Sequence, residues 1–138
     1  MVTNPDQEQI RNLLQESKTI AVVGLSDKAH RTSYQVSEAM QRAGYKIIPV
    51  NPTIENSLGE KAYQQLSDVE EPIDIVNVFR RSEFLPGIAK EAAQMDIKAL
   101  WAQQGVIHQE AYEILEDHHG MVIMDMCIKV AHSILAGK

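Results

Sequence analysis

The strongest constraint on the fold is the alternation of short, β-prone apolar runs with amphipathic helical segments along most of the chain. Apolar runs that predict strands cover residues 19–23, 46–50, 73–79, 97–102 and 121–124. Helical patterns follow at 34–43, 84–95 and 109–119, and a last helix runs to about Ala136. Strands that alternate with helices of about 10 to 15 residues form right-handed βαβ units, which build a parallel sheet. The sequence therefore predicts an α/β fold with helices on both faces of the sheet.

Two segments add to this pattern. Asn4 and Pro5 followed by Gln7 predict an N-cap, a first-turn proline and a capping-box partner, so a short helix is expected from about Pro5 to Glu16. The polar stretch 51–68 begins with Asn-Pro and has room for at most a short edge strand and one helical turn. We see no internal repeat or linker.

Length and charge limit the class of protein. A chain of 138 residues with 44% hydrophobic residues suits one domain, here 1–138. The net charge of −6 disfavours broad contact with nucleic acid or an anionic membrane. Neither a signal-peptide pattern nor a membrane-spanning stretch is apparent, and the single Cys127 excludes an internal disulfide or a Cys-pair metal site. We expect a cytoplasmic protein.

The loop after the first strand is the first candidate site. In a Rossmann-like doubly wound sheet, ligands bind beyond the carboxyl ends of the strands, where strand order reverses. This loop combines Gly24 and Ser26 with the cations Lys28 and Arg31, and Ser33 stands near the start of the next helix. Free backbone N–H groups and the helix dipole suit a phosphate or pyrophosphate there. The alternative is an ordinary loop whose hydroxyls cap the helix.

Two common nucleotide signatures are missing. A dinucleotide site needs G-x-G-x-x-G and an acidic residue about 20 residues later, yet this loop has only Gly24 and the second strand ends in Asn51-Pro52. The Walker pattern, Gly-Lys followed by Ser or Thr, does not occur. The sequence thus disfavours NAD(P) and P-loop hydrolysis.

A second basic segment follows the third apolar run. If that strand lies beside the first, Phe79, Arg80 and Arg81 face the Gly24 loop across one crevice. Guanidinium groups match phosphate oxygens, and the Phe79 ring offers an apolar surface to a base or a thioester arm. Alternatively, the arginines pair with Glu83 or solvate a helix start.

Cys127 lies just beyond the last strand, near the start of the last helix, where the helix dipole would make its thiol more reactive. A buried, inert cysteine is an equally weighted alternative. The histidine spacings reveal neither a metal site nor a Cys-His pair.

Five motifs together resemble a known family. They are Gly24-Leu25-Ser26 through His30-Arg31-Thr32-Ser33-Tyr34, then Ile48-Pro49-Val50-Asn51-Pro52, the segment from Asp74 to Arg81, the segment from Trp101 to Val106, and Asp125-Met126-Cys127-Ile128-Lys129. In this order they resemble the small single-domain CoA-binding proteins of bacteria, which are similar in fold to the CoA-binding domain of the succinyl-CoA synthetase alpha chain. The resemblance runs from about Thr19 to His132.

The resemblance implies where parts of CoA would lie. It implies a pyrophosphate loop of Gly24, Ser26, Arg31, Ser33 and Tyr34, an adenosine end at Asn51 and Pro52, an opposite wall of Phe79, Arg80 and Arg81, and a far side at Gln104 and Gly105. The chain departs from the family pattern at Thr32, where the family often has Pro, and at Met126, where it often has Arg. The second departure removes a cation near Cys127.

The resulting expectation is a protein that binds coenzyme A or an acyl-CoA and has no catalytic residues of its own. The synthetase also needs a second domain with a phosphorylated histidine and a partner chain, for which 138 residues leave no room. One alternative is an NAD(P)-dependent oxidoreductase, which the same fold permits. Another is a thiol-redox protein in which Cys127 forms a mixed disulfide with CoA. The acyl group and any homo-oligomer stay open.

Overall fold

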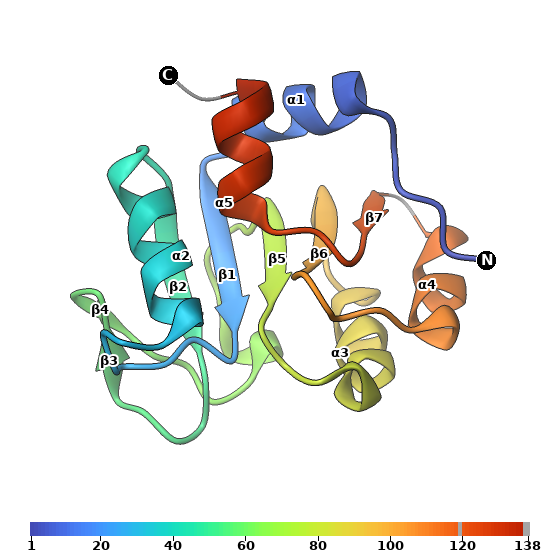
Figure 1. Cartoon of the computed structure of the whole chain (residues 1–138). Coiled ribbons are helices and arrows are strands. Elements are labelled where there is room, and N and C mark those ends of the chain that lie inside the picture. The colour runs from blue at the N-terminus through green and yellow to red at the C-terminus, as the bar shows by residue number, and fades with distance from the viewer. Residues whose placement is uncertain (119, 137–138) are drawn as a thin grey trace.

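The computed structural model describes residues 1–118 and 120–136, and its centre is a five-stranded parallel sheet (Figure 1). The strand order is β2-β1-β5-β6-β7, so the order reverses between β1 and β5. The strands are β1 (Thr19–Val23), β2 (Lys46–Val50), β5 (Ile75–Val78), β6 (Ala99–Ala102) and β7 (Met121–Ile123). The predicted parallel sheet is confirmed, with its switch point beside the first strand.

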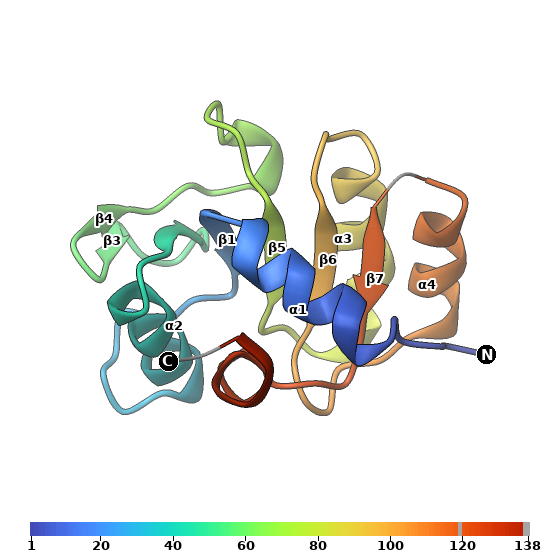
Figure 2. The same ribbon diagram turned by 90° about the horizontal axis from the view of Figure 1, so that it is seen from above.

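Helices cover both faces of the sheet, as Figure 2 shows from above. One face carries α3 (Leu85–Ala92) and α4 (Gln109–Glu116), which contact each other. The other carries α1 (Gln7–Glu16), α2 (Thr32–Arg42) and α5 (Ile128–Ala131), which continues as a π-helix over His132–Ala136. The Rossmann-like doubly wound class is therefore confirmed.

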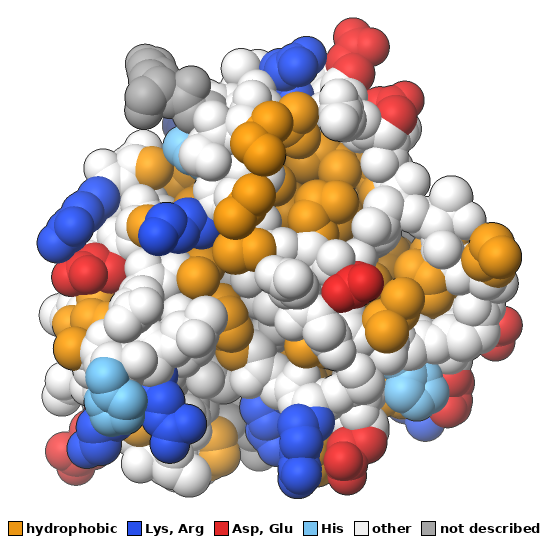
Figure 3. Space-filling view, in the orientation of Figure 1, with side chains coloured by type: hydrophobic (Ala, Val, Ile, Leu, Met, Phe, Trp, Pro, Cys, Tyr) orange, Lys and Arg blue, Asp and Glu red, His pale blue; other side chains and the backbone are white. Residues whose placement is uncertain are grey.

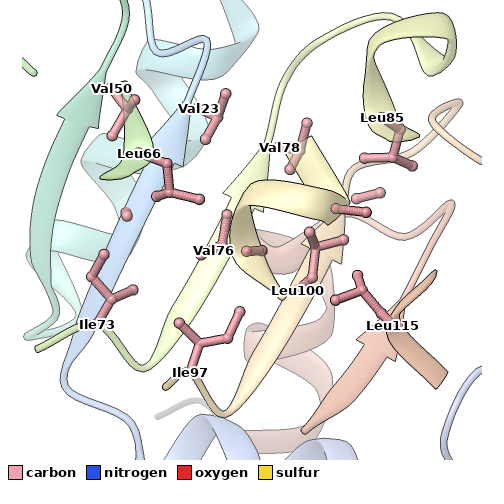
Figure 4. Packing of buried hydrophobic residues seen from close by; sticks show 14 of the residues in the cluster. Val23, Val50, Leu66, Ile73, Val76, Val78, Leu85, Ile97, Leu100 and Leu115 are labelled. Carbon is pink, nitrogen blue, oxygen red and sulfur yellow. The ribbon is translucent and has the colours of Figure 1, made fainter. Parts of the chain in front are cut away.

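The alternating side chains of each strand supply two hydrophobic cores. In β1, Ala21 and Val23 join the core under α3 and α4, whereas Ile20 and Val22 join the core under α1, α2 and α5. Figure 4 shows Val23, Val76, Val78 and Leu100 among the residues of the first core. Because both faces of the strands are buried, the strands appear in the sequence as continuous apolar runs.

The first helix starts later than the sequence predicts. Its N-cap is Asp6, whose carboxylate accepts from the Gln9 N–H at 2.8 Å, and the Gln9 side chain completes the capping box. Asn4 instead donates to the Met124 carbonyl and accepts from the Met124 N–H, both at 2.9 Å. The prediction of an Asn4 cap was wrong because an amide, with one donor and one acceptor side, matches both backbone groups just beyond β7.

The connection after β2 holds a two-stranded antiparallel ribbon, β3 (Asn56–Ser57) with β4 (Glu60–Lys61), and a 3₁₀ turn at Leu66–Asp68. The expected helical turn is confirmed, but the expectation of at most a short edge strand was wrong: the two short strands pair with each other because Leu58 and Gly59, both with positive φ, turn the chain back. At the sheet edge, Tyr63 forms a single bridge to Val50. The α4 helix ends at Glu116, and His119, where the sequence predicted its end, lies outside the described residues. Among the described residues, no helix combines the length and the apolar character needed to cross a bilayer.

Candidate functional site

The loop after β1 meets the end of β5 at the switch point, as the sequence predicted. The Phe79 N–H donates to the Val23 carbonyl, and the Gly24 N–H donates to the Val50 carbonyl, both at 2.8 Å. Gly24 has φ +90°, and a Cβ added there would lie 2.5 Å from the Phe79 carbonyl oxygen. Only glycine therefore lets the backbones approach this closely.

Hydroxyl groups hold the rest of this loop in place. The Ser26 N–H donates to Ser33 Oγ at 3.0 Å, and the Lys28 N–H donates to Ser26 Oγ at 2.9 Å. Ser57 Oγ, from β3, donates to the Ser26 carbonyl at 2.8 Å. Ser26 and Ser33 thus shape the loop instead of capping α2. Sequence reasoning missed Ser57 because its contact joins residues far apart in the chain.

The N-terminus of α2 faces this loop without a side-chain cap. Within the described residues, the N-cap Arg31 makes no capping hydrogen bond through its side chain. The first N–H groups of a helix have no partners inside the helix, so they and the positive end of the dipole suit an anion. Arg31 and Lys28 are exposed beside them, and Tyr34 is half-buried in the first turn. Lys28 also forms a 3.8 Å ion pair with Asp27, which is exposed and therefore weak.

A pocket of about 350 Å³ opens between the ends of β1 and β2 and the helix α3, with Gly24, Asn51, Pro52 and Arg80 in its lining. Four residues that the sequence analysis placed in the site therefore share one pocket. Its volume lies within the range of small-molecule sites, roughly 300 to 1,000 Å³. Sequence reasoning missed other lining residues, Thr53, Gln64, Gln65, Leu66, Ile88 and Glu91, because they come from a loop and a helix face with no local motif.

Asn51 is fixed by three hydrogen bonds. Its Nδ2 donates to the Leu25 carbonyl at 3.0 Å, and its Oδ1 accepts from the Thr53 N–H at 2.9 Å and from Thr53 Oγ1 at 2.8 Å. The side chain therefore links the loops after β1 and β2 and gives the pocket a rigid wall.

The two arginines after β5 differ in their surroundings. The Arg80 guanidinium lies 4.3 Å from the centroid of the Phe84 ring, a cation–π contact that holds this half-buried side chain at the pocket. Arg81 lies 5.5 Å from the same ring, is largely exposed, and approaches Glu83 at 3.8 Å. The alternative reading of an arginine paired with Glu83 thus holds for Arg81. Sequence reasoning missed Phe84 as the surface beneath both guanidinium groups.

The far side of the sheet edge carries the remaining predicted residues. Gln104 and Cys127 line a second pocket of about 410 Å³, whereas Gly105 lies in the adjoining turn. The Gly105 N–H donates to Asp125 Oδ1 at 2.7 Å, and Ser82 Oγ donates to the Gly105 carbonyl at 3.4 Å. These bonds connect the loops after β5, β6 and β7. The predicted residues therefore share one edge but occupy two pockets.

Cys127 is the N-cap residue of α5, and its side chain is half-buried against the core beneath α1, α2 and α5. Phe79 and Met126 pack against the same core. In the part of the chain that the structure describes, no group of three or more His, Cys, Asp or Glu residues is placed to hold a metal ion.

Comparison with known proteins relates the chain to CoA-binding domains. The family model described as CoA binding domain matches residues 18–133. The chain is 58% identical to the YneT protein of Bacillus subtilis over 131 residues, which are 95% of this chain and 97% of YneT. It is also 26% identical over 81 residues to an ADP-forming acetate–CoA ligase of Methanocaldococcus jannaschii, and the match spans 59% of this chain but 12% of the ligase.

Among solved structures, cell-free ID.343 from Thermus thermophilus has a TM-score of 0.90 and 32% identity, with 95% of this chain and 99% of that chain covered. The family model covers all five strands of the sheet and the loops that follow them. The chain belongs to the CoA-binding domain family.

Proposed function

We propose that the protein binds coenzyme A or an acyl-CoA along the carboxyl edge of the sheet, and that it does so without catalysing a reaction of its own. The observation that carries the proposal is the pocket in which Gly24, Asn51, Pro52 and Arg80 come together. The loop that starts at Gly24 leads to the N-terminus of α2, which has no side-chain cap. CoA is a long ligand with phosphates near one end and a thiol at the other. The pocket and the helix end would receive the phosphate-bearing part.

The phosphates would meet three kinds of donor. The first-turn N–H groups of α2 and the helix dipole favour an anion, Arg31 stands at the same helix end, and Arg80 is held in the pocket by Phe84. Local positive charge is needed because the chain as a whole carries −6. Figure 3 shows Lys and Arg side chains along the lower edge of the molecule, where β1 and β5 end in Figure 1.

The thiol arm would cross the edge toward β7. Phe79 lies between the Gly24 loop and the far side, and its ring packs against the same core as Cys127. Gln104 and Cys127 would then lie near the thiol end of the ligand. This direction also suits the second candidate, in which the Cys127 thiolate attacks CoA disulfide, forms a mixed disulfide with one CoA and releases the other as a thiolate, because Cys127 lines the second pocket.

An NAD(P)-dependent oxidoreductase is the weaker candidate. The residue at the end of β2 is Asn51, whose amide is committed to Leu25 and Thr53, so no carboxylate stands there for the ribose hydroxyls. The name of the acetate–CoA ligase relative includes CoA, but the matched segment is 12% of that ligase. We therefore assign CoA binding, but no ligase reaction, to this chain.

Arginine variants test the proposal. We expect Arg80→Ala to weaken CoA binding roughly 10-fold to 100-fold, because losing one charge-assisted hydrogen bond costs about 1.5 to 3 kcal/mol. Arg80→Lys should recover only part of the affinity, since it keeps the charge but loses the planar fork. Arg31→Ala should weaken binding too, and Arg81→Ala should have the smallest effect of the three because Arg81 is exposed beside Glu83.

The matched control is Arg42→Ala. Arg42 is also exposed and pairs with Glu38 at 3.5 Å, but it lies at the C-terminal end of α2, away from the proposed phosphates. Its loss should change affinity little, and added salt should weaken wild-type binding more than binding by Arg80→Ala. If Arg80→Ala and Arg31→Ala bind CoA as tightly as Arg42→Ala in isothermal calorimetry, this crevice does not bind CoA.

A further inference from the structure

An apolar groove continues from the far side of the sheet edge along α5. It is the second pocket, of about 410 Å³, and its apolar lining consists of Pro5, Ile10, Met126, Val130, Ala131, Ile134 and Leu135. Ile134 is 72% exposed and Val130 is 52% exposed, although both are large hydrophobic side chains. Figure 3 shows hydrophobic side chains gathered over the upper part of this face, where Figure 1 places α5 and α1. Exposed apolar patches of this kind mark binding sites.

The groove begins at the residues proposed for the thiol end of CoA. Its lining includes Gln104 and Cys127, which are also the residues that the thiol end of CoA would reach. Met126 and Cys127 line the groove and also pack against the core that Phe79 contacts, so the groove and the Phe79 wall belong to the same side of the sheet. Whatever is attached to the CoA sulfur would therefore lie along Val130 and Ile134.

The charge of the groove limits which kind of acyl group on the CoA sulfur it can hold. Among its described lining residues, Asp125 carries the only charge, and its carboxylate already accepts from the Gly105 N–H. The described lining residues include no Lys or Arg, so a carboxylate buried at the end of the acyl group would meet the charge of Asp125 and an apolar wall, which is unfavourable. Arg11 donates to the Leu135 carbonyl at 2.9 Å, but it is exposed to water, where an ion pair contributes little. A plain hydrocarbon chain would lose contact with water at no such cost.

We propose, on the basis of the CoA site above, that this groove holds the hydrocarbon chain of an aliphatic acyl-CoA. The chain enters past Cys127 and lies against Val130 and Ile134. The shape favours this occupant over a second copy of the protein. The groove is a hollow within the size range of small-molecule sites, whereas a stable interface needs about 800 Å² from each partner.

Calorimetric titrations with CoA, butyryl-CoA, hexanoyl-CoA, octanoyl-CoA and succinyl-CoA test the proposal. Each methylene that becomes fully buried should tighten binding roughly threefold to fourfold, so affinity should rise steadily from butyryl-CoA to octanoyl-CoA. Succinyl-CoA should bind no more tightly than CoA. If CoA binds but chain length has no effect, the acyl groove is wrong while the CoA site stands. If CoA itself does not bind, the proposed function fails.

A matched pair of variants locates the effect. Ile134→Asn removes apolar surface from the groove without adding charge, and it should abolish most of the gain from the octanoyl chain while leaving CoA affinity unchanged. Ser133→Asn alters the exposed neighbour outside the groove and should keep the gain. If the affinity increase from CoA to octanoyl-CoA is equal in both variants, the acyl chain binds elsewhere. A fall in molecular mass for Ile134→Asn in sedimentation, with no acyl gain in wild type, would instead assign the groove to a second copy.

Discussion

Replacing Gly24 by alanine tests the close approach of β1 and β5 that forms the crevice. The residue has φ +90°, and the added Cβ would lie 2.5 Å from the Phe79 carbonyl oxygen. A side chain in left-handed backbone costs about 1–2 kcal/mol. Overpacking against a fixed neighbour adds about 1–3 kcal/mol. We therefore expect Gly24→Ala to lower the free energy of unfolding by about 2–5 kcal/mol, the sum of these two costs.

Gly44→Ala is the control for the backbone cost alone. Gly44 has φ +110°, and a Cβ there would meet nothing within 4 Å. Gly44→Ala should lower the free energy of unfolding by about 1–2 kcal/mol. The difference between the two variants then gives the cost of the clash with the Phe79 carbonyl. Urea unfolding can be followed by the fluorescence of Trp101, the single tryptophan, which is buried. A Gly24→Ala variant no less stable than Gly44→Ala would refute the reasoning.

Two further predictions concern stability. The buried Tyr45 hydroxyl donates to the Leu14 carbonyl, so Tyr45→Phe should cost about 0.5–1.5 kcal/mol near neutral pH. Burial raises the pKa of Tyr45 above 10.0, so this tyrosine stabilises the fold below pH 10.0 and loses that contribution as pH rises through its folded pKa. In urea titrations, the difference in free energy of unfolding between wild type and Tyr45→Phe should shrink at alkaline pH. A difference that stays constant with pH would contradict the stabilising role of the Tyr45 hydroxyl. Asn4→Ala should lower the free energy of unfolding by about 1–3 kcal/mol, because it leaves the Met124 N–H and carbonyl without their partners. Hydrogen exchange at the Met124 amide should also become faster. Unchanged exchange would mean that Asn4 does not anchor the N-terminal segment.

Most of the fold could be predicted from the sequence because each strand is buried on both faces. Runs such as residues 19–23 stay apolar throughout, and no other local structure explains five of them at this spacing. The cap of α1 was harder to predict, since Asn4 and Asp6 are both good cap residues. Only the distant Met124, which bonds to Asn4, decides between them.

The residues that meet in the candidate site were predictable where local chemistry is distinctive. A lone glycine followed by Ser26, Lys28 and Arg31 indicates an anion loop, whereas the different surroundings of Arg80 and Arg81 depend on where Phe84 and Glu83 lie in space. Neighbours in sequence thus have different surroundings in the structure. No motif could rank the two arginines.

The apolar groove left a signal in the sequence that was not recognised. The last helix carries Ile128, Val130, Ala131, Ile134 and Leu135, so its apolar residues occupy more than one face. Ile128 faces the core, while Val130 and Ile134 are exposed. A helix with more apolar residues than one buried face requires indicates a second apolar contact.

The central claim, that the carboxyl edge binds CoA, is tested most directly by calorimetric titration of the purified protein with CoA in the absence and presence of NAD and NADP. The account predicts a saturable heat of CoA binding that neither dinucleotide changes at similar concentrations, because the loop has one glycine and β2 ends at Asn51. Binding of NAD as tight as or tighter than that of CoA would contradict it.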